Sequence, residues 1–129
     1  MHQDLLTTIN KRSLISVMNN SKWAKLANAL MNLEKMEPFV RIKDIYEDEP
    51  SGFSLFDWTF SEYNPARLEW VDINPIQKVH RGRLISDLEV DVTELVLNAI
   101  LSTKIPYSKE ESYFRIWGYY EAGKVPDFL

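Results

Sequence analysis

Two histidines, His2 and His80, and nineteen carboxylates are the side chains of this sequence that could carry acid–base or metal chemistry. The chain has no cysteine, which excludes thiol catalysis, thiolate metal ligands and disulfides. No HxH or HExxH spacing occurs, and the calcium-loop pattern DxDxDG is missing around residues 47–49. The sequence therefore predicts no metal site.

Serines and glycines give no sign of nucleophilic or nucleotide-dependent catalysis. The motif GxSxG does not occur, and Ser51-Gly52 is typical of a turn. The four glycines are well separated, so neither GxGxxG nor GxxxxGK can form a phosphate-binding loop. We therefore expect no catalytic residue of the common kinds and no cofactor.

Paired carboxylates leave one enzymatic alternative open. Asp57 beside Trp58 and Glu69 beside Trp70 are expected on neighbouring strands, where one carboxyl group could act as acid and the other as base. Alternating strands also place such residues toward solvent for no catalytic reason. A small hydrolase using Asp/Glu chemistry is therefore an alternative function.

A basic cluster, KVHRGR, holds Lys78, His80, Arg81 and Arg83. Such a cluster can bind the phosphate backbone of a nucleic acid. A solvated loop that pairs with nearby acids is the simpler interpretation. Nucleic-acid binding through residues 78–83 is therefore a minor alternative.

The charges are distributed unevenly along the chain, whose formal net charge is −4. Residues 44–73 carry eight acids against one arginine, a net charge of −7, whereas residues 1–43 carry +4. A dense acidic centre repels a phosphate backbone and suits a basic protein partner. The other interpretation is that these acids only keep one face of a sheet solvated.

The hydrophobic periodicity predicts an α+β fold in one domain, residues 1–129, with the element order α-α-β-β-β-α-β. Helices are expected over residues 4–18, from Lys22 toward Pro38 with Ser21 as N-cap, and between Asp91 and Ile105. Together they would cover one face of a sheet.

Four strands are expected to form a mainly antiparallel sheet. Residues 38–47 and 53–60 read as a hairpin, because DEPSG between them suits a tight reversal. Residues 67–73 and 112–120 supply the third and fourth strands. Residues 76–90 are expected to contain a long loop.

The last strand has the most suggestive surface. Alternation directs Phe114 and Ile116 to the core, and aromatic and arginine side chains to the opposite face. Such side chains dominate binding hot spots. A covering layer, from the first helix or residues 76–90, would instead bury them. The hypothesis of a partner-binding surface comprises Tyr113, Arg115, Trp117, Tyr119, Asp57, Glu47, Asp48 and Glu49.

Two blocks, Asn-Asn-Ser-Lys-Trp at residues 19–23 and the stretch from Ile105-Pro106-Tyr107 to Trp117-Gly118-Tyr119, resemble an uncharacterised bacterial family of domains of unknown function. The resemblance extends over nearly the whole chain and implies no catalytic residues. In size, acidity and aromatic content the chain is also similar to immunity proteins of bacterial toxin systems. That similarity implies that a toxin is the partner.

Location follows from what the sequence lacks. No basic start precedes an apolar stretch, and no run approaches the roughly 18 apolar residues of a membrane span. We expect a cytoplasmic protein with no membrane partner. The leading hypothesis is a non-enzymatic module that binds a basic protein, and an exposed terminal strand could also join two copies in a homodimer.

Overall fold

The computed structural model describes residues 2–33 and 37–129 and confirms the α+β fold. The helices are α1 (His2–Lys11), α2 (Asn20–Met31) and α3 (Thr93–Thr103), with a short 3₁₀ helix η1 (Pro65–Arg67). The strands are β1 (Leu14–Ser16), β2 (Val40–Asp44), β3 (Leu68–Ile73), β4 (Ile76–Val79), β5 (Leu88–Asp91), β6 (Tyr107–Glu110), β7 (Tyr113–Trp117) and β8 (Tyr119–Glu121).

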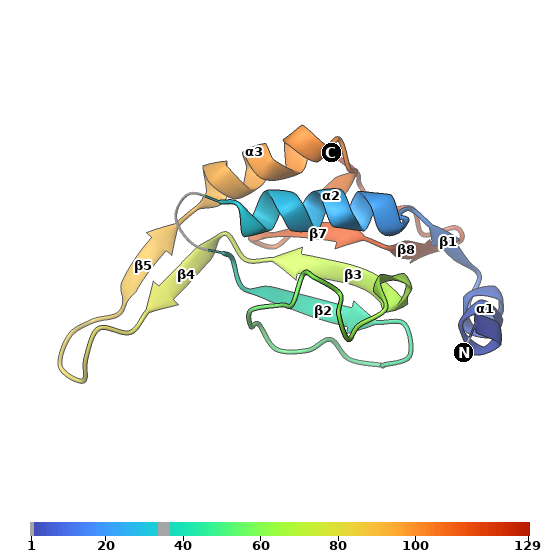
Figure 1. Ribbon diagram of the computed structural model, residues 1–129, viewed down its shortest axis with the longest axis horizontal. Coiled ribbons are helices and arrows are strands. Elements are labelled where there is room, and N and C mark those ends of the chain that lie inside the picture. Colours follow the sequence, from blue (N-terminus) through green and yellow to red (C-terminus); the bar gives the residue numbers. More distant parts are fainter. Residues whose placement is uncertain (1, 34–36) are drawn as a thin grey trace.

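An antiparallel four-stranded sheet with the order β2-β3-β7-β6 forms the centre of the molecule. Helices α2 and α3 lie together on one face of it (Figure 1). Two smaller antiparallel pairs, β1-β8 and β4-β5, lie toward opposite ends. None of the helices in the described part of the chain is long and apolar enough to cross a membrane.

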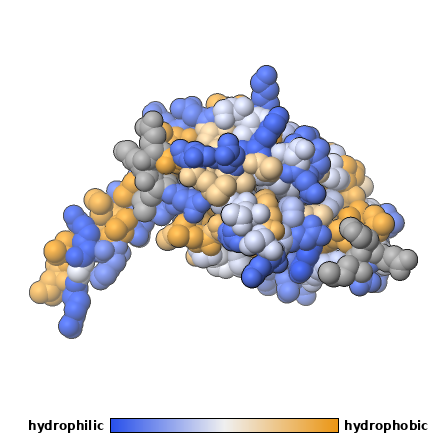
Figure 2. Space-filling model, in the orientation of Figure 1, coloured by the Kyte–Doolittle hydropathy of each residue, from blue (hydrophilic) through white to orange (hydrophobic). Residues whose placement is uncertain are grey.

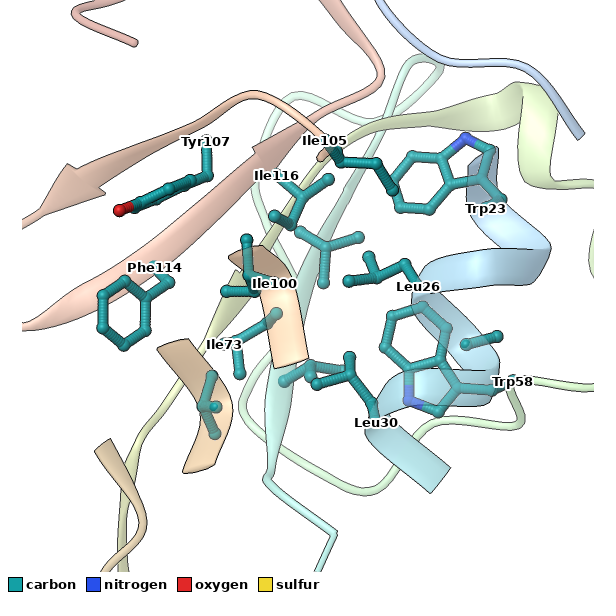
Figure 3. Packing of buried hydrophobic residues seen from close by; sticks show 14 of the residues in the cluster. Trp23, Leu26, Leu30, Trp58, Ile73, Ile100, Ile105, Tyr107, Phe114 and Ile116 are labelled. Atoms are coloured by element: carbon teal, nitrogen blue, oxygen red, sulfur yellow. The ribbon is translucent and has the colours of Figure 1, made fainter. Parts of the chain in front are cut away.

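The main core lies between the two helices and the sheet (Figure 3). Trp23, Leu26 and Leu30 recur at helical spacing on α2 and are almost fully buried, which confirms the predicted amphipathic helix, although it ends at Met31 and does not continue toward Pro38. Phe114 and Ile116 of β7 meet them from the sheet, as alternation predicts. Each large side chain of this kind stabilises the fold by about 1.5–3 kcal/mol.

The first helix is shorter than its periodicity predicts. It ends at Lys11, and Ser13 then adopts a left-handed backbone conformation with φ 54° that redirects the chain. Residues 14–16 pair with β8 instead of continuing the helix. The expected cap of the second helix is also wrong, because the side chain of Asn19, and not of Ser21, accepts the hydrogen bond of a free helix N–H.

Residues 53–60, predicted as the second strand of a hairpin, are not a strand. Together with their flanks they form an irregular segment, residues 45–64, which we name the wrapping segment. It makes a single β-bridge to the edge of β2, between Ser54 and Val40. Trp58 then crosses to the helical side, where it lies beside Leu30 (Figure 3). Covering the edge of β2 in this way blocks strand addition by another chain.

Two other segments differ from the expected order. Residues 107–110 form β6, an edge strand that the sequence analysis did not identify and that completes the sheet in place of residues 53–60. Residues 76–90 were expected to contain a long loop, and the structure adds two strands to it, because β4 and β5 form an antiparallel pair on either side of residues 80–87. This hairpin, which we name the arm, projects from the body of the molecule (Figure 1).

The predicted last strand is interrupted at Gly118. Its N–H donates to the carbonyl oxygen of Glu69 and its own carbonyl accepts from Val17, so the chain passes from one sheet to the other at this residue. A Cβ atom at this position would lie 1.9 Å from the carbonyl oxygen of Leu68. Only glycine permits this close approach of two backbones.

We therefore expect Gly118→Ala to lower the free energy of unfolding by about 2 kcal/mol or more, because the backbone of β3 must shift to admit the methyl group. Urea denaturation measures the change. Gly52→Ala is the matched control, since no atom lies within 4 Å of a Cβ there. Equal stability of the two variants would contradict the packing described for Gly118.

Candidate functional site

The face of the central sheet opposite α2 and α3 carries charged and aromatic side chains. We name it the polar face. Register places Arg41, Asp72 and Arg115 in one cross-strand row and Lys43, Trp70 and Trp117 in the next. Its members, which alternate with core residues along the strands, are Arg41, Lys43, Trp70, Asp72, Tyr113, Arg115 and Trp117.

Asp72 lies at the centre of the polar face and is fully buried. Arg115 donates from Nε to Oδ1 at 2.6 Å and from Nη2 to Oδ2 at 3.0 Å. Arg41 donates from Nη2 to Oδ2 at 2.8 Å. A buried carboxylate needs such partners, and removing either side of the pairing leaves an uncompensated charge. These contacts give Asp72 a structural role.

The aromatic rings of the polar face stack on the same two arginines. The guanidinium of Arg115 lies 3.7 Å from the ring centre of Trp70 and 5.3 Å from that of Trp117. Arg41 lies 5.3 Å from the ring centre of Tyr113. These cation–π contacts leave Tyr113, Arg115 and Trp117 half-buried among one another.

Glu69 forms a second ionic cluster beside the first. Both its oxygens accept hydrogen bonds from Arg12 at 2.9 Å, and Lys43 lies 3.1 Å from Oε1. Nearby, Glu121 pairs with Lys124, and their hydrogen bond holds the pKa of Glu121 below its usual value. An open hollow of about 230 Å³ is lined here by Glu69, Trp70, Trp117, Tyr120, Glu121 and Lys124.

Asp44, at the end of β2, is the third buried acid. It accepts from the hydroxyl of Tyr63 at 2.5 Å and from Arg67 at 2.9 Å. Burial and the contact with Asp44 raise the pKa of Tyr63 well above its ordinary value of 10.0. Asp44 therefore holds the wrapping segment against the end of the sheet.

The other five acids of residues 44–73 are exposed, and no ion pair forms at any of them within the described part of the chain. All five belong to the wrapping segment. Tyr46 and Leu55, exposed by 42% and 58%, add apolar surface to the same segment. The five acids are Glu47, Asp48, Glu49, Asp57 and Glu62.

Asp57 lies in a turn. Its carboxylate accepts hydrogen bonds from Thr59 and Ser61, which lower its pKa. The pair of Asp57 and Glu69 expected on neighbouring strands is therefore wrong, since Asp57 is outside the sheet. His80 is exposed on the arm, 3.2 Å from Asp87. The hollow beside Trp70 is lined by Glu69 but by neither Asp57 nor His80, so the three candidate acid–base residues do not share it.

The structure divides the predicted partner-binding residues. Tyr113, Arg115 and Trp117 share the polar face, but the expected alignment of Tyr119 with them is wrong. Tyr119 is buried because the strand breaks at Gly118, and its hydroxyl donates to the carbonyl of Ala66 at 2.7 Å. It packs in a small second core with Leu5, Leu14 and Ile45.

Sequence reasoning missed the ionic centre of the polar face. Alternation in RLEWVDI places Trp70 and Asp72 on one side, which was the available signal. Their partner Arg41 is separated from Asp72 by 31 positions, so only the strand register brings the two together. Among the described residues, no three His, Asp or Glu are grouped so as to hold a metal ion.

Replacing Asp72 with Asn should lower the free energy of unfolding by about 3 kcal/mol, because two part-buried arginines lose their counter-charge. Urea denaturation at neutral pH measures the loss. Asp127→Asn changes an exposed acid and should alter stability by less than about 0.5 kcal/mol. If Asp72→Asn lowered the free energy of unfolding as little as Asp127→Asn does, the structural role of the cluster would be contradicted.

Tyr63 should make the fold sensitive to alkali. Its raised pKa means that the folded protein keeps a proton that the unfolded chain releases, so stability is full below pH 10.0 and falls as the pH rises further. On going from neutral to alkaline pH, the free energy of unfolding should fall less in Tyr63→Phe than in the parent, because the variant has no phenol to ionise. Urea titrations at both pH values test this, and an identical loss would contradict it.

One comparison with known proteins gives a match. The family model DUF6678, described as a family of unknown function, matches residues 5–123. The matched region includes the polar face, the wrapping segment and the arm. No curated protein and no solved structure matches the chain significantly.

Proposed function

The chain belongs to DUF6678, a family of unknown function, and we propose that it is a non-enzymatic module that binds a basic protein partner. The single observation that carries this proposal is the division of the acids. Three of the eight acids in residues 44–73 are buried and paired, while five remain exposed in the wrapping segment. A partner with a basic surface would meet this segment.

Free carboxylates on one surface attract a basic partner and accelerate its association. The exposed side chains of Tyr46 and Leu55 add apolar area to the same segment. The wrapping segment also adjoins the polar face, because the rings of Phe53 and Tyr113 lie 4.8 Å apart. A partner seated on the acids would therefore extend toward Tyr113, Arg115 and Trp117.

The partner that we propose is a basic toxin, which the module would neutralise as an immunity protein. The basis is the exposed acidic surface together with the small size of the chain. Neutralisation needs only tight occupation of the toxin and no chemistry by the module. Charge-steered association would give the speed that such protection requires.

The test is retention of a basic protein from the native host by the immobilised domain. Neutralising the acids Glu47, Asp48 and Glu49 to Gln, Asn and Gln should reduce retention by about tenfold or more, since the steering field is lost. Retention should also fall between about 50 mM and about 300 mM salt, because salt screens exposed charges.

The matched control neutralises three exposed acids outside the wrapping segment, with Glu94→Gln, Glu111→Gln and Asp127→Asn. It should retain the partner like the parent. Equal retention by both triple variants would overturn the proposed surface. Co-expression with the retained protein tests the immunity role, which predicts that the domain relieves the growth arrest that this protein causes alone.

A further inference from the structure

The arm projects from the body of the molecule with most of its surface in solvent (Figure 1). At its base the amide of Gln77 is buried and donates to the carbonyl of Glu37 at 2.7 Å. Val92 N–H donates to Pro75 O at 2.8 Å on the same side. The base is therefore anchored, whereas most residues of the outer part are exposed.

The tip of the arm exposes large apolar side chains. Leu84 is 100% exposed, Ile85 55% and Leu88 44%. Figure 2 shows hydrophobic side chains along this projection, beside strongly hydrophilic ones. Adjacent apolar residues at the end of a projecting hairpin form a patch that is typical of interaction sites.

Side-chain hydrogen bonds hold the tip in shape. Arg81 donates from Nε and Nη2 to the carbonyl of Ser86 at 3.0 and 2.9 Å, and His80 lies 3.2 Å from Asp87. Arg81 and Arg83 surround Gly82, whose φ of 148° few other residues adopt. The tip therefore presents apolar side chains beside two arginines.

A hollow of opposite charge lies at the end of β2. It has a volume of about 290 Å³ and combines the apolar side chains of Ile42 and Pro50 with the carboxylates of Glu47 and Glu49. The arm lies at one end of the long axis of the molecule, and β2 runs through the body toward the other end, where α1 and β1 lie (Figure 1). Two molecules that lie side by side with their long axes antiparallel would bring the arm of each to the hollow of the other.

We propose that the arm of one copy docks on this hollow of a second copy, with Leu84 and Ile85 against Ile42 and Pro50. The arginines of the tip then face Glu47 and Glu49. A two-fold axis makes both contacts at once and closes the assembly as a dimer. This inference rests on the proposed function in one respect, because both require that the acids of the wrapping segment bind a basic surface. The dimer would cover that surface until a basic partner displaces the arm.

Sedimentation velocity over about 10–200 μM protein, around the affinities of weak reversible dimers, tests the proposal. The parent should form dimers, and Leu84→Asp should raise the dimer dissociation constant by about tenfold or more. Leu101→Asp is the matched control, because Leu101 is 53% exposed on α3 and should leave the constant unchanged. A monomeric parent throughout this range, or dimers indifferent to Leu84→Asp, would overturn the proposal.

Charge reversal identifies the docking site. Arg83→Glu and Glu49→Arg should each weaken the dimer, and the chain carrying both should recover it, since opposite charges face each other again. Failure of the combined variant to recover would show that the arm docks elsewhere, which overturns the proposal.

The variants also separate this inference from the proposed function. Leu84→Asp keeps every acid of the wrapping segment, so it should retain a basic host protein at least as well as the parent. If the parent stays monomeric but retains a basic host protein through its exposed acids, only the dimer is refuted. A dimer that depends on Leu84 and Glu49, in a protein whose retention ignores the acids, would refute only the proposed function.

Discussion

The carboxylate of Asp72 is fully buried on the side of the sheet opposite α2 and α3, between the guanidinium groups of Arg41 and Arg115. Ionised groups in such a position must be paired. To reach Asp72 both arginines lie along the sheet, and Arg115 thereby covers Trp70. Cation–π stacking thus follows from the ion pairs. Ion pairs and cation–π contacts among its own side chains hold the polar face together, and Phe53 of the wrapping segment packs on Arg41 and Tyr113.

The same demand for pairing explains the distribution of charge. Asp44, Glu69 and Asp72 each bind at least one base, and Glu69 takes Arg12 from the N-terminal part of the chain. A net charge of −7 for residues 44–73 therefore overstates what solvent meets across the sheet face. The unpaired remainder is concentrated in the wrapping segment, where it faces solvent, and this position is the reason why we propose a basic partner.

Elements with long local patterns were predictable, and elements that depend on distant partners were not. Helix α2 repeats its apolar positions over three turns, and β7 alternates buried with half-buried residues, so the α+β fold followed from sequence. Strands β1 and β6 have only three and four residues, too few for a pattern. Residues 53–60 alternate like a strand, but Phe53 packs on Arg41 of the polar face whereas Trp58 packs in the main core. Tyr119 was misplaced because alternation was continued through Gly118.

The central claim is that pairing buries some acids of residues 44–73 and leaves others free. Carbodiimide coupling of a small amine to the folded protein, followed residue by residue with mass spectrometry, measures which carboxylates solvent reaches. We predict rapid modification of Glu47 and Glu49, and modification of Asp72 only after unfolding in denaturant. Modification of Asp72 in the folded protein at the rate of Glu47 would contradict the account.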